Sequence, residues 1–136
     1  MTTTNLTESL SGVRGRWGES ITPAFAERYA AVFTQWVRAH VGHAPRFLIG
    51  MDTRASSPRI RRAMIAGMRR GGAHAVLDIG VSTTPAAFLS VPWSRADAGI
   101  MITASHNEPP FNGWKFIRPD GSVLHAEDMA TVQRRV

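Results

Sequence analysis

The chain has 136 residues, of which 43% are hydrophobic, so it is long enough to bury one sizeable core but too short for two comfortably stable domains. Its 16 basic and 10 acidic residues give a net charge of +6, which suits nucleic acid, an anionic membrane and a phosphorylated small molecule equally well. The absence of cysteine excludes disulfides and thiolate metal sites, and the N-terminus lacks the basic and apolar segments of a secretory signal, so we expect a cytoplasmic protein.

Helix and strand patterns alternate in the first half of the chain. A helix is predicted from Thr22-Pro23, where a hydroxyl residue before proline matches the N-cap and N1 positions, to a C-cap at Gly42. The apolar run 46–51 predicts a strand buried on both faces. A second helix is predicted from Ser57-Pro58 to Gly71-Gly72, and we interpret its arginine-rich side as a solvated face.

The second half of the chain continues this alternation. Residues 74–79 and 98–103 predict two more strands buried on both faces, and a third helix begins between them at Thr84-Pro85. A short strand is predicted at 114–117 and a final helix at 126–136. Together these elements predict an α/β fold, a three-layer α/β/α sandwich with a mixed, mainly parallel sheet of about four strands. We expect a flexible N-terminus at 1–9 and the domain at 10–136.

Two of the predicted strands end in segments with chemically active side chains. Ligands of open α/β sheets bind beyond the carboxyl ends of the strands, and Arg54 follows one such end while Ser105 and His106 follow another. A serine that carries a phosphoryl group needs a base or metal to activate it and cations to hold the transferring oxygens. His106, Arg54 and Lys115, the only lysine, are of these types. Taken singly, each side chain fits an ordinary loop or surface role as well.

A longer motif distinguishes these alternatives. The string Ile102-Thr-Ala-Ser-His-Asn-Glu-Pro-Pro-Phe-Asn-Gly-Trp-Lys-Phe116 closely resembles the active-site loop of the α-D-phosphohexomutases, the phosphoglucomutase and phosphomannomutase superfamily. Residues 11–15 resemble the N-terminal motif of that superfamily, and residues 50–58 resemble the segment after its second strand. The resemblance runs from about residue 10 to the end and is to the N-terminal domain I. Glu108 departs from the pattern, because a proline usually follows the Ser-His-Asn.

The resemblance implies a role for each matching residue. Ser105 would carry a phosphate, pass it to a hexose monophosphate, and recover the other phosphate of the hexose 1,6-bisphosphate intermediate. Lys115 would shuttle protons, and His106 would act as a further acid or base or as an orienting group. The implied catalytic set is Ser105, His106, Lys115 and Arg14. The implied phosphate-binding set is Arg14, Arg54, Ser105, Asn107 and Lys115.

The family is built from four domains, and this sequence resembles only the first. The resemblance implies Mg²⁺ as cofactor, with Ser105 as a ligand through its phosphate and the main ligands in another domain. We therefore expect part of an intramolecular phosphotransferase of the isomerase class, inactive by itself, whose partners are hexose phosphates and the remaining mutase domains or chains. The type of hexose and the oligomeric state stay open, with a slight preference for glucose or mannose phosphates at Thr103 and Phe111.

Two other classes of function are compatible with parts of the sequence. A non-catalytic phosphosugar-binding or regulatory module would keep the same fold without the missing domains. A nucleic-acid-binding protein would explain the charge of +6 and the arginines at 59–70, but no recognised nucleic-acid motif accompanies them. We expect neither nucleic acid nor a membrane as partner.

Overall fold

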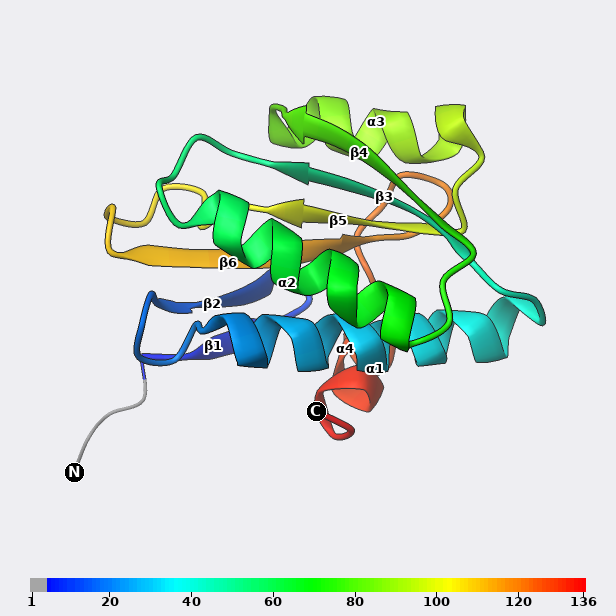
Figure 1. Ribbon diagram of the computed structural model, residues 1–136, viewed down its shortest axis with the longest axis horizontal. Helices are drawn as coiled ribbons and strands as arrows, with labels where there is room; N and C mark the ends of the chain where they lie inside the picture. Colours follow the sequence, from blue (N-terminus) through cyan, green and yellow to red (C-terminus); the bar gives the residue numbers. More distant parts are fainter. Residues whose placement is uncertain (1–4) are drawn as a thin grey trace.

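The computed structural model describes residues 5–136, which form a single mixed sheet with helices on both of its faces (Figure 1). The strands lie in the order β1-β2-β6-β5-β3-β4. Their bounds are β1 Thr7–Ser9, β2 Gly12–Arg16, β3 Arg46–Met51, β4 Ala75–Val81, β5 Ala98–Ile102 and β6 Phe111–Ile117. The helices are α1 Pro23–Val41, α2 Ser57–Arg70, α3 Thr84–Ser94 and α4 Ala126–Gln133.

The predicted α/β class is confirmed, but the sheet differs from the prediction in two respects. It has six strands rather than about four, and the pairings β1-β2, β2-β6 and β5-β6 are antiparallel while only β3-β4 and β3-β5 are parallel. The prediction missed β1 and β2 because these short, polar and glycine-containing strands show no apolar run. Residues 1–4 of the predicted flexible N-terminus lie outside the described residues, and the expected boundary at residue 10 falls inside the β1-β2 hairpin.

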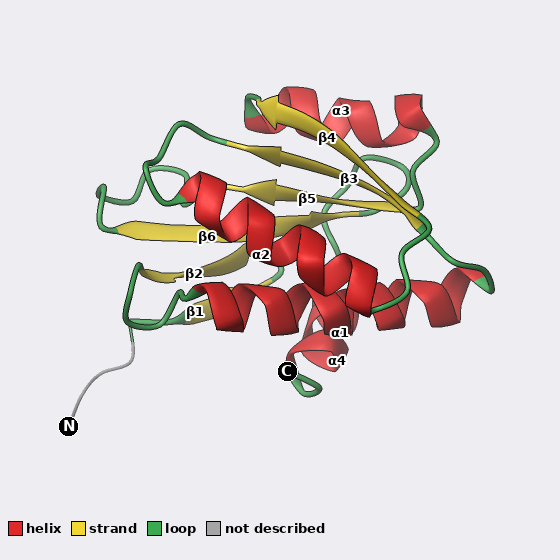
Figure 2. Cartoon of the chain, viewed as in Figure 1, coloured by secondary structure: helices red, strands yellow, loops and turns green. Residues whose placement is uncertain are grey.

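The helix starts follow local sequence. The Thr22 side chain accepts a hydrogen bond from Phe25 N at 3.2 Å, and Gly42 ends α1 with a left-handed φ of 76°, as the sequence predicts. Helices α2 and α3 each begin one residue earlier than predicted. Their N-caps are Ser56 and Thr83 rather than Ser57 and Thr84. In Figure 2, α1 and α2 lie together in front of the sheet.

The main core lies between the sheet and helices α1, α2 and α4. Alternate residues of a strand point to opposite faces, and Phe47 and Ile49 of β3 enter this core whereas Leu48 enters a smaller core under α3. Phe33 and Phe116 pack against each other at the centre, with ring centroids 4.0 Å apart and ring planes tilted by 32°. These two separate cores establish the three-layer arrangement.

A buried tyrosine connects this core to the edge of the sheet. Tyr29 of α1 is fully buried, and its hydroxyl donates to Glu8 Oε1 of β1 at 2.8 Å. Gln133 of α4 donates to the other oxygen of the same carboxylate at 3.0 Å. Burial and the hydrogen-bonded Glu8 carboxylate raise the pKa of Tyr29 far above its ordinary value. Glu8 thus joins β1, α1 and α4.

The opposite edge of the sheet is more exposed than predicted. The strand expected at 74–79 is β4. The expectation that both of its faces are buried is wrong, because Leu77 is 51% exposed and Val81 is 61% exposed. β4 is an edge strand, and α3 lies against β3 and β5 instead of covering it. Helix α3 also has an apolar outer side, on which Trp93 is 86% exposed. This apolar surface of α3 and β4 lacks any covering element in residues 5–136.

Candidate active site

The β5-β6 connection presents Ser105 beyond the carboxyl end of β5; together with the first residue of β6 it spans residues 103–111, and we call this segment the serine loop. Ser105 is exposed and has a φ of +56°, a left-handed backbone conformation that is uncommon outside glycine. Two local hydrogen bonds hold this turn: Ser105 N donates to Thr103 Oγ1 at 3.0 Å, and Asn107 N donates to Ala104 O at 3.1 Å. Such strained backbone persists where surrounding contacts enforce it and is common at functional sites.

Arg54, which follows β3, supplies the largest group of those contacts. Its Nη1 donates to the carbonyls of Glu108 at 2.9 Å and Phe111 at 3.0 Å. Its Nη2 donates to the carbonyls of Ser105 at 3.1 Å and Asn107 at 2.7 Å. Its Nε forms an ion pair with Asp52 at 3.2 Å. All five N–H groups of the guanidinium therefore have partners within the protein.

A polar network lies beneath the serine loop and joins it to the start of α2. Ser57 Oγ donates to Asp52 Oδ1 at 2.7 Å, so this serine helps to hold the carboxylate in place. The fully buried Asn112 donates from Nδ2 to the Oγ atoms of Ser56 at 2.7 Å and Ser57 at 3.0 Å. Its Oδ1 accepts from Gly113 N at 2.8 Å. Because the two bonds from Asn112 span 56 and 55 residues of sequence, they fix the start of β6 relative to the start of α2.

Asp52, Ser57 and Asn112 are site residues for which no role was predicted from the sequence. Asn112 lies inside the quoted loop motif, and Asp52 lies in the segment after β3 that was already singled out. The signal available was their polar character in otherwise apolar surroundings, since a buried amide needs hydrogen-bonding partners. Their partners, however, come from distant parts of the chain.

Strands β2 and β6 carry Arg14 and Lys115 on the same face of the sheet, and Arg14 contacts the serine loop. Arg14 lies opposite Gly113 in the antiparallel ladder, and its Nη1 donates to Asn107 Oδ1 at 3.4 Å. Lys115 Nζ donates to Ser11 O at 2.9 Å. Burial, with a smaller contribution from the positive charge of Arg14, lowers the pKa of Lys115. A lysine with a lowered pKa is better suited to accept and return protons near neutral pH.

A glycine makes this close pairing possible. Gly12, at the start of β2, has a φ of +117°, and a Cβ at this position would overlap the carbonyl oxygen of Trp114. Any other residue there would push β2 away from β6. Gly12 therefore lets the strands that carry Arg14 and Lys115 approach each other closely.

The serine loop and the segment after β3 border an open hollow. An open hollow of about 510 Å³ is lined by residues that include Arg54, Ser105 and Asn107. His106 and Glu108 are exposed, and within residues 5–136 the His106 side chain forms neither a hydrogen bond nor an ion pair. The structure thus gathers Ser105, Asn107 and Arg54 at one hollow, adds Arg14 through Asn107, and leaves His106 apart from these contacts.

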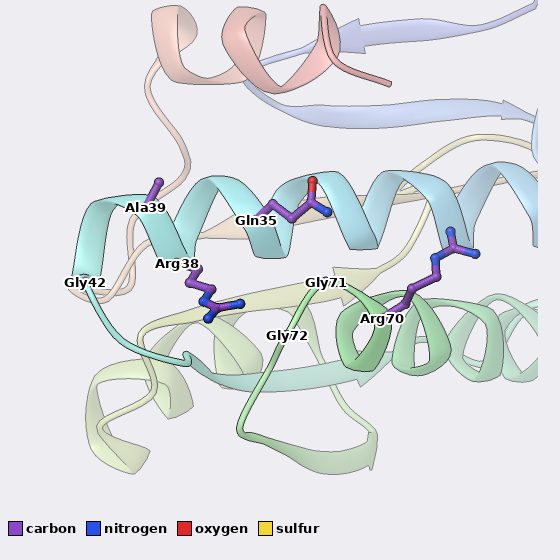
Figure 3. Close-up of a pocket in the computed structure, with 7 residues that line it drawn as sticks. All are labelled: Gln35, Arg38, Ala39, Gly42, Arg70, Gly71 and Gly72. Atoms are coloured by element: carbon purple, nitrogen blue, oxygen red, sulfur yellow. The ribbon is translucent and has the colours of Figure 1, made fainter.

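A second open hollow lies away from this site, at the C-terminal ends of α1 and α2, and measures about 530 Å³ (Figure 3). Arg38 and Arg70 are its charged residues. Arg70 pairs with Glu27 at 2.7 Å, and basic side chains at the end of a helix offset the negative end of its dipole. These arginines therefore have a structural explanation.

Two properties of residues 5–136 bear on other classes of function. The described side chains include no cluster of three or more His, Asp or Glu residues able to hold a metal ion. None of the helices in that part of the chain has both the length and the apolar character needed to cross a membrane.

The fold and the site define a class: an α/β/α domain that presents an exposed serine beyond the carboxyl end of a strand. One arginine holds the loop of this serine, and a second arginine and a lysine lie on neighbouring strands. Comparison with known proteins specifies this class further. Residues 7–136 match the profile of the phosphoglucomutase/phosphomannomutase alpha/beta/alpha domain I. The chain belongs to this family, and residues 7–136 form the family's domain I.

Individual relatives agree with this membership. The chain is 38% identical over 122 residues to the phosphoglucomutase/phosphomannomutase of Thermococcus kodakarensis, covering 90% of this chain and 26% of that protein. It is 42% identical over 120 residues to the phosphoglucosamine mutase of Leuconostoc citreum, and this match covers 85% of this chain and 26% of that protein. A solved family protein of Burkholderia thailandensis superposes with a TM-score of 0.81 at 25% identity, covering 94% and 29%. The chain thus spans about a quarter of the length of these relatives.

Proposed function

We propose that this chain is the phosphoserine-bearing domain of a phosphohexomutase and that Ser105 carries the phosphate that interconverts hexose 1-phosphate and hexose 6-phosphate. The observation that carries the proposal is the exposed Ser105 in a strained turn beyond β5, with Arg14 and Lys115 on the adjoining strands. Family membership supports the same reaction class. Relatives named for glucose, mannose and glucosamine phosphates all match, so the proposal does not choose among these hexoses.

In the proposed reaction, a hydroxyl oxygen of the hexose monophosphate attacks the phosphorus on Ser105. The new P–O bond forms as the bond from phosphorus to Ser105 Oγ breaks, the hydroxyl proton leaves to a base, and the serine oxygen takes up a proton. The bisphosphate then returns its other phosphoryl group to Ser105 by the reverse steps. Lys115, with its lowered pKa, is the candidate for moving these protons.

Arg14 is the candidate for holding the phosphate oxygens. Among the described residues its guanidinium makes one hydrogen bond, of 3.4 Å, so several N–H groups remain for a ligand. Phosphoryl transfer is catalysed mainly by positioning and by cations placed around the transferring group. Asn107, which lines the hollow, and the exposed His106 complete the proposed set.

The residues present do not by themselves make a magnesium site. A phosphate on Ser105 would offer one oxygen ligand, whereas Mg²⁺ needs several converging oxygens, and residues 5–136 hold no such carboxylate cluster. We therefore propose that the other ligands come from another part of the enzyme, and no step above depends on the ion. The cytoplasmic location is also part of this proposal.

Phosphate mapping tests the proposed function. The chain is incubated with glucose 1,6-bisphosphate, and intact mass and peptide mapping then locate any phosphate. We expect one phosphate, on Ser105, in the wild type and none in Ser105→Ala. If Ser105 stays unmodified even when a phosphohexomutase lacking its own domain I is added, the reaction proposed here is refuted, and a non-catalytic phosphosugar-binding module becomes the better account.

We further propose that the apolar surface of α3 and β4 receives another domain of the mutase. The relatives are about four times as long as this chain, and an apolar helix face of this kind is usually covered. Binding to a phosphohexomutase that lacks domain I would be measured for Trp93→Lys and for Leu10→Lys, an exposed leucine in the β1-β2 turn. We expect only Trp93→Lys to weaken binding. Equal binding by both variants, or self-association of the chain through Trp93, would contradict this surface assignment.

A further inference from the structure

Four carbonyl groups of the serine loop converge on one side chain. The oxygens of Ser105, Asn107, Glu108 and Phe111 all accept hydrogen bonds from Arg54, at distances between 2.7 and 3.1 Å. These residues cover nearly the whole loop, so its backbone is wrapped around the guanidinium. Removal of that group would leave four carbonyls without their common partner.

The same contacts argue against Arg54 as a phosphate ligand. A guanidinium has five N–H groups, and in Arg54 four bind loop carbonyls while the fifth binds Asp52. The Asp52 carboxylate offsets its charge, and the side chain is only 15% exposed. A phosphate could reach Arg54 only by displacing contacts that hold the loop. Arg14, which makes one long bond among the described residues, has no such restriction.

The contacts also act at the strained residue. Ser105 keeps its left-handed φ of +56° although such a conformation costs an L-residue free energy. Arg54 binds the carbonyl of Ser105 itself and that of Asn107, so it restrains the turn on both sides of His106. Asp52 in turn is held by Ser57, which lies in the buried network with Asn112.

We infer that Arg54 is the positioning residue of the serine loop: it holds Ser105 in the orientation for phosphoryl transfer and does not bind the phosphate itself. The claim that Ser105 is held for phosphoryl transfer rests on the proposed function. The claim that Arg54 holds the loop, the structural half of the inference, rests on the loop contacts alone. It revises the phosphate-binding role that the resemblance implies for Arg54.

The geometry predicts which substitutions preserve this role. Lysine has three donors on one nitrogen and cannot reach four carbonyls and a carboxylate that surround a planar group. Arg54→Lys should therefore behave nearly like Arg54→Ala. Guanidinium ion added at millimolar concentration, far below the molar range that denatures proteins, should restore Arg54→Ala but leave Arg54→Lys unrestored, since the lysine side chain fills the site.

Hydrogen exchange of the backbone amides at 103–111 tests the structural half. The variants are Arg54→Ala and Arg54→Lys, with Arg62→Ala, an exposed arginine of α2, as the matched control. We expect faster exchange confined to the serine loop in both Arg54 variants, unchanged exchange in the control, and recovery of Arg54→Ala with guanidinium ion. Unchanged loop exchange in both variants would overturn the inference. Should Arg54→Ala lose its fold, Arg54→Lys provides the same comparison.

The rate of phosphate uptake at Ser105 from glucose 1,6-bisphosphate tests the functional half. Because a displacement of about 1 Å at a reacting group costs about 100-fold in rate, we expect a loss of about that size in both Arg54 variants with little change in the concentration for half-maximal rate. A raised half-maximal concentration with an unchanged maximal rate would instead identify Arg54 as a phosphate ligand. Absence of uptake by the wild type, even with a phosphohexomutase lacking its own domain I present, would refute the proposed function, while the exchange data would still decide the role of Arg54.

Discussion

Truncation of the buried amide beneath the serine loop is a direct test of how the site is held. Asn112→Ala removes two donated bonds, to Ser56 and Ser57, and leaves Gly113 N without its acceptor at 2.8 Å. The side chain is fully buried, so water cannot easily replace these partners. The perturbation therefore removes the link between the start of α2 and the start of β6.

The expected cost follows from these contacts. An unsatisfied buried polar group costs about 1–3 kcal/mol, and here the Gly113 amide loses its partner outright whereas the two serines keep or find others. Adding a modest term for the small cavity gives a loss of about 3 kcal/mol in the free energy of unfolding. For a domain of this size, that loss lowers Tm by roughly 10 °C.

Urea unfolding followed by circular dichroism measures this loss. Asn107→Ala is the matched control, because Asn107 carries the same side chain in the same loop but makes one side-chain bond, of 3.4 Å. We expect the control to change the free energy of unfolding by less than about 1 kcal/mol. If Asn112→Ala costs no more than Asn107→Ala, the buried network does not hold the loop and the reasoning fails.

Three further predictions concern single groups. Burial and Arg14 lower the pKa of Lys115, so the folded state releases this proton at a lower pH than the unfolded state. The free energy of unfolding should therefore rise as pH rises through the lowered pKa towards 10.5. Lys115→Met should lack this rise in urea titrations. Tyr29, the only tyrosine, has a raised pKa, so its contribution to the free energy of unfolding is present below pH 10 and is lost as pH rises above it. Absorbance should show the phenolate of Tyr29 appearing only with unfolding, and at a lower pH in Glu8→Gln than in the wild type. Trp93→Lys should change the free energy of unfolding of the chain alone by less than about 0.5 kcal/mol, as thermal unfolding would show, because the side chain is 86% exposed.

Local sequence was sufficient for most helices and for the position of the serine loop. A hydroxyl residue before proline favours a helix start through contacts with the next few residues, and α1 begins at Pro23 and ends before Gly42 as that pattern predicts. The apolar run 46–51 coincides with β3. The motif from 102 to 116 placed Ser105 after a strand, because the residues that define the motif are neighbours in the chain.

Only the tertiary structure decided how these segments meet. The β1-β2 hairpin pairs with β6 through polar and glycine residues that carry no apolar periodicity, and the exposure of β4 depends on which strands α3 covers. Arg54 was recognisable from the sequence as a cation near the serine, but its four carbonyl partners lie 51 to 57 residues away. Residue type and spacing predict local backbone and chemistry, whereas the partner of a long, charged side chain depends on contacts made after the chain has folded.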